Sequence, residues 1–168
     1  MKPVHAVVMG VSGCGKSVVG LRIAQALGLP AIEGDAFHPP ANIDKMRQGL
    51  ALDDTDRAGW LALLGEQLAA QAGGAVLSCS ALKAAYRDRL RAAVPGLRFV
   101  HLALSQDEAG RRVAGRGDHF YPPSLVASQF EALQDPSAEP GVLVLDATLP
   151  LDEVAARAVA WLRPPGGG

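Results

Sequence analysis

Residues 10–17 read Gly-Val-Ser-Gly-Cys-Gly-Lys-Ser, which is a complete G-x-x-x-x-G-K-[ST] phosphate-binding pattern. The apolar run 4–9 before it has the length and the β-branched content of a buried strand. Residues 18–27 after it carry apolar side chains at helical spacing, and Gly28 is suited to end that helix. A strand, a glycine-rich loop and a helix in this order turn successive backbone N–H groups toward one anion. The alternative is a chance match in a glycine-rich segment, but the flanking strand and helix favour a phosphate loop. We therefore predict that the chain binds a nucleoside triphosphate.

Side chains at the end of this loop have separate expected roles. Lys16 can reach the β- and γ-phosphates, and the Ser17 hydroxyl is a ligand for Mg²⁺. The glycines allow the phosphate to approach closely and supply the positive φ values of the turn. The residues that we expect to bind the nucleotide are Gly10, Ser12, Gly13, Cys14, Gly15, Lys16, Ser17, Val18, Arg112 and Arg116.

Length and composition predict one globular domain over residues 1–163, followed by a disordered tail, 164–168. The net charge of −1 gives no support for a nucleic-acid or membrane-surface partner. The two cysteines lack the spacing of a metal site, and we expect both to stay reduced in the cytoplasm. No segment approaches the ~20 apolar residues that span a bilayer.

Apolar runs alternate with segments of helical period along the chain. This order predicts an α/β fold with a parallel sheet covered on both faces, and active residues at the carboxyl ends of its strands. Strands are expected near 4–9, 31–34, 75–79, 98–104 and 142–146, and helices near 59–72, 81–93, 106–114, 123–133 and 151–162.

Two segments fit the sheet poorly. Residues 36–58 are polar and contain four aspartates, which suggests an insertion that covers the substrate. Residues 115–124 contain glycines and a Pro-Pro pair beside arginines, which suggests a mobile lid. Phosphoryl transfer requires such coverings, because a γ-phosphate exposed to water would be hydrolysed.

Asp35 is the best candidate for the base at an acceptor hydroxyl, because it follows the second strand and so shares a rim with the phosphate loop. The alternative is that Asp35 caps the helix after it. Two roles fit Glu33 equally: holding a magnesium-bound water, or orienting its neighbours.

Arg112 and Arg116 lie four residues apart, so one helical face would carry both guanidinium groups toward the phosphates. The alternative is that Arg112 and Arg116 lie on a solvated helix face. We interpret Arg87, Arg89 and Arg91 as a group in that way. His38 and His119 fall in the two covering segments, whereas strand histidines 5 and 101 are assigned no role.

Together these motifs resemble the gluconokinase family, small P-loop enzymes that phosphorylate D-gluconate. The two most specific blocks are Cys79-Ser-Ala-Leu-Lys83 and the His38-Pro39, Asn42, Lys45-Met46 segment. The full resemblance runs from about residue 9 to 136. It also includes Gly34-Asp35, Asp54, Asp56-Arg57, Trp60-Leu61, Tyr86-Arg87-Asp88, Arg112, Arg116, His119-Phe120 and Ser128-Gln129-Phe130-Glu131. The departures are Ala51 and Gly59 where the family usually has Pro, Glu33 for Asp, Asp118 for Gly and Cys14 for Ser.

The resemblance implies a three-layer fold like that of nucleoside-monophosphate kinases, with a five-stranded parallel sheet, a substrate-binding insertion and a lid. It also implies ATP with Mg²⁺, phosphorylation of gluconate at the 6-hydroxyl, and a homodimer. Catalysis is then assigned to Lys16, Asp35 and Arg116. A polyhydroxylated carboxylate calls for cations and hydrogen-bonding groups, which Asp35, His38, Arg57, Lys83, Tyr86, Arg87 and His119 supply. We favour Arg57 for the carboxylate.

Two other functions remain as alternatives. A shikimate kinase or another small-molecule kinase shares the phosphate loop, but shikimate kinases have a glycine run where this chain has Cys79-Ser-Ala-Leu-Lys83. A nucleotide-dependent switch is suggested by Asp56-Arg57-Ala58-Gly59, which matches the short D-x-x-G pattern of GTPases. No N-K-x-D motif accompanies this pattern, and substrate-stimulated ATP turnover would separate the two classes.

Overall fold

The computed structural model describes residues 3–50, 52–115 and 124–163. Five parallel strands form one sheet in the order β2-β3-β1-β4-β5. They are β1 (Val4–Met9), β2 (Ala31–Glu33), β3 (Gly74–Ser78), β4 (Arg98–Ala103) and β5 (Val142–Asp146). The central strand β1 pairs with β3 and β4, with Val7 opposite Leu77 and Val8 opposite Val100. The predicted parallel α/β fold is therefore confirmed.

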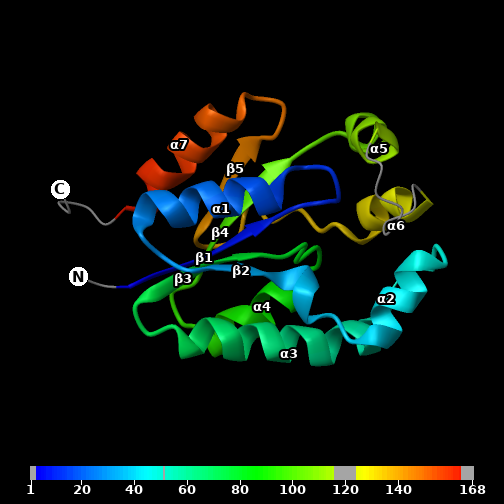
Figure 1. The fold of residues 1–168 in the computed structure, drawn as a ribbon, viewed down its shortest axis with the longest axis horizontal. Helices are drawn as coiled ribbons and strands as arrows, with labels where there is room; N and C mark the ends of the chain where they lie inside the picture. Colours follow the sequence, from blue (N-terminus) through cyan, green and yellow to red (C-terminus); the bar gives the residue numbers. More distant parts are fainter. Residues whose placement is uncertain (1–2, 51, 116–123, 164–168) are drawn as a thin grey trace.

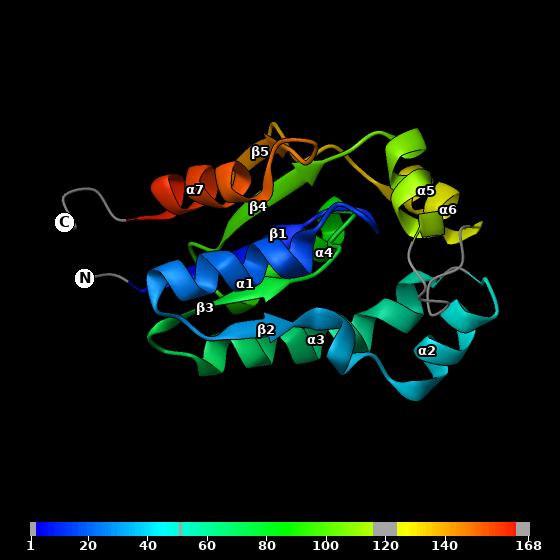
Figure 2. The same cartoon turned by 45° about the horizontal axis from the view of Figure 1, so that its top comes forward.

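Helices cover both faces of this sheet (Figure 1). The described helices are α1 (Lys16–Leu27), α2 (Pro40–Arg47), α3 (Asp54–Ala70), α4 (Ala84–Ala93), α5 (Gln106–Gly115), α6 (Ser124–Ala132) and α7 (Leu151–Leu162), with a short 3₁₀ helix at Gly34–Phe37. Helices α1 and α7 lie on one face, and α3 and α4 lie on the other. Helices α2, α5 and α6 gather near the carboxyl ends of the strands (Figure 2). None of the helices described is both long and apolar enough to cross a membrane.

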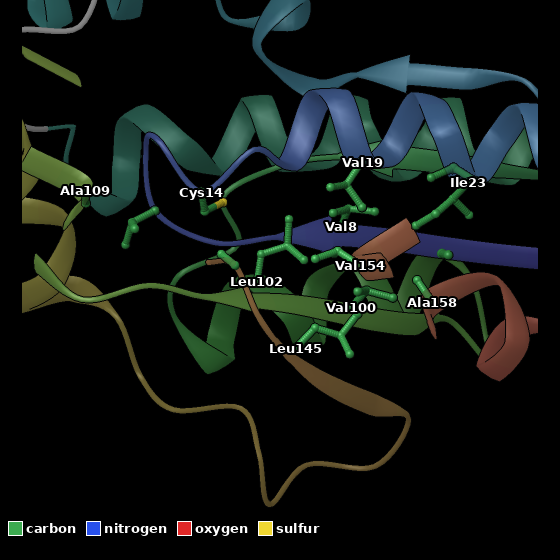
Figure 3. Close-up of a cluster of buried hydrophobic side chains, with 14 of the residues drawn as sticks. Val8, Cys14, Val19, Ile23, Val100, Leu102, Ala109, Leu145, Val154 and Ala158 are labelled. Atoms are coloured by element: carbon green, nitrogen blue, oxygen red, sulfur yellow. The ribbon is translucent and has the colours of Figure 1, made fainter. Parts of the chain in front are cut away.

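Successive residues of β1 enter different cores, because side chains of a strand alternate between the faces of the sheet. Ala6 and Val8 pack under α1 and α7 in the cluster that Figure 3 shows. Val7 and Met9 pack against α3 and α4 on the other side, together with Trp60. This double burial explains why β1 and β3 read as continuous apolar runs.

Two helix starts differ by three residues or more from the sequence-based prediction, and one helix was not predicted. Helix α3 begins at Asp54, five residues earlier than expected, because Asp53 and Asp56 form a capping box by exchanging backbone and side-chain hydrogen bonds. Helix α4 begins at Ala84 rather than at residue 81, where Ala81 has a φ of +46°. The polar segment 36–58 contains α2, which starts at Pro40.

Candidate active site

The phosphate loop links β1 to α1 and leaves open space above its backbone. Gly10 has a φ of +150°, and a Cβ there would come within 2.7 Å of Cys14 Sγ, so only glycine fits. Gly15 caps α1 with a φ of +91°, and a Cβ on it would meet nothing within 4 Å. No side chain caps α1, and its first turn contains no acidic residue. The positive end of α1 therefore offers its N–H groups to an anion.

Arg112 reaches this loop from α5. Its guanidinium donates to Gly13 O at 2.9 Å and to Ala147 O at 3.1 Å, and its Nε donates to Glu108 at 3.2 Å. The exposed arginine of this helix is Arg111, which pairs with the other oxygen of Glu108. Arg112 therefore lies against the phosphate loop and not on a fully solvated face of α5.

A cavity of about 320 Å³ adjoins the loop on the α7 side of the sheet. Its walls include Val18, Arg112, Ala147 and Leu149. Apolar walls with one cationic group suit the nucleoside end of a nucleotide whose phosphates lie over α1. Cys14 also lines this cavity, and burial raises the pKa of its thiol.

A second pocket lies on the other side of the loop, at the carboxyl end of β2. It brings together four residues that the sequence analysis assigned to catalysis or substrate binding: Lys16, Asp35, His38 and Arg57. Ser12, Met46, Leu52, Trp60, Ser80 and Gln129 complete its lining. We call this the acceptor pocket. The lysine of the phosphate loop and a carboxylate in one pocket match what phosphoryl transfer to a hydroxyl requires.

His38 is buried in the wall of the acceptor pocket. Its ring stacks on Trp60 with centroids 4.0 Å apart, and Trp60 Nε1 donates to Gly34 O at 2.8 Å. Burial lowers the pKa of His38 to about 4; Asp35 opposes that shift and Arg57 adds to it. The ring is therefore neutral at pH 7.

The side chains of Arg57, Lys83 and Tyr86 form one cluster beside the acceptor pocket. Arg57 donates to the Tyr86 hydroxyl at 3.3 Å, and its guanidinium lies 5.4 Å from the centre of that ring. Lys83 Nζ donates to Asp54 Oδ1 at 3.0 Å, and the Tyr86 hydroxyl donates to the same oxygen. These bonds hold the pKa of Asp54 below its usual value. Within the described residues, no carboxylate forms an ion pair with Arg57.

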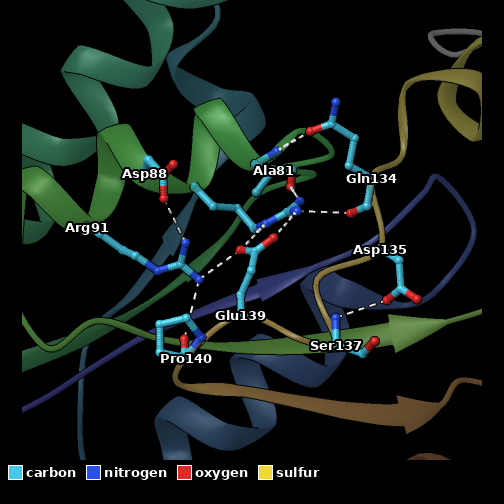
Figure 4. A network of polar contacts seen from close by, with 10 residues as sticks. Ala81, Asp88, Arg91, Gln134, Asp135, Ser137, Glu139 and Pro140 are labelled. Carbon is cyan, nitrogen blue, oxygen red and sulfur yellow. Dashed lines mark hydrogen bonds and ion pairs between the residues drawn. The ribbon is translucent and has the colours of Figure 1, made fainter.

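Arg87 does not face the acceptor pocket, although the sequence analysis assigned it to substrate binding and to a polar helix face. Its side chain is fully buried and paired with Glu139 through two hydrogen bonds, of 2.9 and 2.6 Å. It also donates to Ala81 O at 2.7 Å and to Gln134 O at 2.9 Å (Figure 4). Arg87 therefore fixes the loop before α4 to the segment between α6 and β5.

Arg116 and His119 lie outside the described residues, as does most of the expected lid, 115–124. Gln129 is a pocket residue to which the sequence analysis gave no role. Its Oε1 accepts from the Ser12 N–H at 2.6 Å, which joins α6 to the phosphate loop. Only its inclusion in the resemblance blocks marked this residue in the sequence.

Three further observations concern a large cavity, possible metal ligands and Cys79. A cavity of about 760 Å³ lies at the opposite end of the sheet, lined by residues such as Val4, Val94 and Leu162. It is larger than either pocket beside the phosphate loop but contains none of the candidate residues. Among the described residues, no group of three or more His, Cys, Asp or Glu could hold a metal ion. Cys79 is buried, which raises the pKa of its thiol to about 12.

Comparisons with curated protein sequences and with solved structures agree on the relatives of this chain. No protein-family profile matches the chain. The gluconokinase of Gluconobacter oxydans (strain 621H) is 48% identical over 146 residues, which are 85% of this chain and 82% of that protein. The crystal structure of a gluconokinase from Sinorhizobium meliloti 1021 has a TM-score of 0.88 at 50% identity, covering 96% of this chain and 92% of that one. The Mycobacterium tuberculosis APS kinase CysC, solved with AMPPNP and APS, shares the fold, with a TM-score of 0.69 at 22% identity over 96% of this chain and 99% of its own.

Proposed function

Because the chain belongs to the gluconokinase family, we propose that it transfers the γ-phosphoryl group of ATP to the 6-hydroxyl of D-gluconate. The products are 6-phospho-D-gluconate and ADP. The observation that carries this proposal is the acceptor pocket, where Lys16 of the phosphate loop and Asp35 line one space. A transferable phosphoryl group and an acceptor hydroxyl must meet in such a space.

The phosphate loop and α1 bind the triphosphate. The uncapped N–H groups at the start of α1 donate to the phosphate oxygens, and Lys16 neutralises charge on the β- and γ-phosphates. Ser17, at the end of the phosphate-binding pattern, would hold Mg²⁺ together with the phosphates. When bound, Mg²⁺ would neutralise charge on the phosphate oxygens. The cavity beside Val18 and Arg112 accepts the nucleoside.

Asp35 accepts the proton of the 6-hydroxyl as the hydroxyl oxygen forms its bond to the γ-phosphorus. The bond from that phosphorus to the bridging oxygen breaks, and ADP leaves. The Asp35 side chain is half exposed toward the pocket, where a substrate hydroxyl can reach it. Arg116 is proposed to stabilise the transferring group from the lid, 115–124.

Gluconate is held by the insertion, 36–58, and by the segment after β3. Arg57 is proposed to bind its carboxylate, because a guanidinium without a carboxylate partner among the described residues is available for one. His38, Lys83, Tyr86 and His119 are proposed to bind its hydroxyl groups. We also propose that the protein acts in the cytoplasm as a homodimer.

The alternatives, a shikimate kinase or a nucleotide-dependent switch, are not favoured by the relatives. Product analysis tests the proposal against both. Incubation with ATP, Mg²⁺ and ¹³C-labelled gluconate should give one phosphate ester, and its carbon–phosphorus coupling should appear at carbon 6. Lys16→Ala should lower kcat by several orders of magnitude and keep Tm within a few degrees. Phosphorylation at another carbon, or near-normal turnover by Lys16→Ala, would contradict the assignment.

A further inference from the structure

The two ring nitrogens of His38 face different kinds of group. Nδ1 lies 3.2 Å from Asn42 Nδ2, and Nε2 lies 3.7 Å from Asp35 Oδ1. The ring is held between them by its stacking on Trp60 and is only 8% exposed. Which nitrogen carries the proton decides what the ring presents to Asp35.

The Asn42 side chain settles this question through its second contact. Its Nδ2 also lies 3.0 Å from the backbone carbonyl of Asp56, at the start of α3. A carbonyl oxygen only accepts hydrogen bonds, so the amide group that faces it must be NH₂ and not the amide oxygen. The same NH₂ group faces Nδ1 of His38. Nδ1 must therefore accept, and the proton of the neutral ring must be on Nε2.

We propose that Asn42 is a positioning residue that locks His38 in the Nε2–H tautomer, so that a fixed donor and the Asp35 acceptor together receive one substrate hydroxyl. The distance of 3.7 Å between Nε2 and Oδ1 exceeds that of a direct hydrogen bond. A hydroxyl oxygen that lies to one side of this pair, about 2.8 Å from each atom, accepts from Nε2–H and donates its own proton toward Asp35. This geometry orients the hydroxyl for deprotonation.

The charged groups around the ring are compatible with a neutral donor. Asp35 faces it from the 3₁₀ helix and favours protonation, whereas Arg57 faces it from α3 and opposes protonation. Asp56 presents its backbone carbonyl to Asn42, and its carboxylate is bound to Lys45 at 2.7 Å. Burial of the ring favours the neutral form further.

Nitrogen NMR on the folded wild-type protein tests the tautomer directly. The sequence has four histidines, so the ring signals are few, and His38→Gln identifies the His38 signals by their loss. We expect Nε2 protonated and Nδ1 unprotonated at pH 7. A protonated Nδ1, alone or together with Nε2, would overturn the proposal. This measurement needs no substrate and does not depend on the proposed function, whereas the identity of the hydroxyl does.

Asn42→Asp tests the consequence, because a carboxylate there accepts from Nδ1 and favours the opposite tautomer or the charged ring. We expect kcat/KM for gluconate to fall at least tenfold, with the KM for ATP unchanged within twofold. Asp44→Asn, at an exposed position of the same helix, is the matched control and should match wild type. In a His38→Gln background, Asn42→Asp should cost less than twofold more. A full tenfold loss in that background would mean that Asn42 does not act through His38.

Discussion

Arg57 lines the acceptor pocket together with Lys16, and we propose that it binds the carboxylate of the substrate. Its possible structural partners are already occupied, because Asp54 is bound by Lys83 and Tyr86, and Asp56 is bound by Lys45. Arg57 is itself oriented by the hydroxyl and ring of Tyr86. Arg57 forms no ion pair with an aspartate among the described residues, although its charge contributes to the lowered pKa of Asp54, so a variant must separate a structural role from substrate binding.

We predict that Arg57→Lys raises the KM for gluconate by tenfold or more, about 1.4 kcal/mol, because an ammonium cannot form the two parallel bonds of a guanidinium. The KM for ATP should barely move, and Tm should stay within about two degrees. Steady-state kinetics and thermal unfolding of one purified variant provide both values. The matched control is Arg89→Lys, at an exposed position of α4. A large loss of Tm with an unchanged gluconate KM would show a structural role instead.

Arg87 illustrates how a sequence block can be recognised while the role of one member is misassigned. Its side chain is the one charged side chain of α4 that is fully buried, and it connects Glu139, Gln134 and the carbonyl of Ala81. These partners are 6 to 52 residues away in the chain. Helical spacing indicates which residues share a face of α4, but it gives no sign of the segment that covers that face.

At the scale of elements, we predict that Arg87→Met destabilises the fold and leaves substrate binding intact. Removing the guanidinium leaves the carbonyls of Ala81 and Gln134 without their donor and leaves the partly buried Glu139 with Arg91 as its remaining cation, which costs about 3 kcal/mol. Urea unfolding should show a lower midpoint, while the KM for gluconate of the folded variant stays within twofold of wild type. Arg89→Met is the control two residues along the same helix. A variant with normal stability and a raised gluconate KM would restore the substrate-binding assignment.

The strands were predicted within a residue or two, because short apolar runs give a strong signal in the sequence, most clearly for β3, which is buried along its whole length. Helix starts were less predictable where side chains decide them. The residues of the Asp53–Asp56 capping box are visible in the sequence. The four aspartates of the polar segment 36–58 nevertheless favoured its interpretation as an irregular insertion. The positive φ of Ala81, whose carbonyl accepts from the buried Arg87 guanidinium, could not be predicted, because no glycine or asparagine marks it in the sequence. The roles of Asn42 and Gln129 could not be predicted, because both side chains contact residues of other elements. Asn42 donates to the Asp56 carbonyl, and Gln129 accepts from the Ser12 N–H.

At the scale of the whole molecule, His38 makes stability depend on pH. Its pKa of about 4 in the folded state lies below the usual 6.5, so the unfolded chain binds more protons between these values. The free energy of unfolding therefore falls as pH decreases from 6.5 to 4, by up to about 1.4 kcal/mol per pH unit from this group. The contribution is fully present above pH 6.5.

We predict that His38→Gln flattens the pH dependence of stability in this window, because an amide does not titrate and can still contact Asn42. Urea unfolding of both proteins at pH 7, 6, 5 and 4.5 measures the difference between their slopes. Below pH 4 the two should run parallel, because carboxylates with lowered pKa values such as Glu139 then dominate. Equal slopes between pH 6.5 and 4.5 would mean that His38 titrates normally in the folded protein.

The central claim is that the acceptor pocket serves gluconate, and the most direct test is coupled ADP release with a panel of acceptors. The panel contains gluconate, shikimate, other sugar acids and nucleoside monophosphates, each with ATP and Mg²⁺. We predict a kcat/KM for gluconate at least a hundredfold above that of any other acceptor, and ADP release without an acceptor near background. A higher value for shikimate or a nucleoside monophosphate, or ADP release that gluconate does not stimulate, would contradict the account.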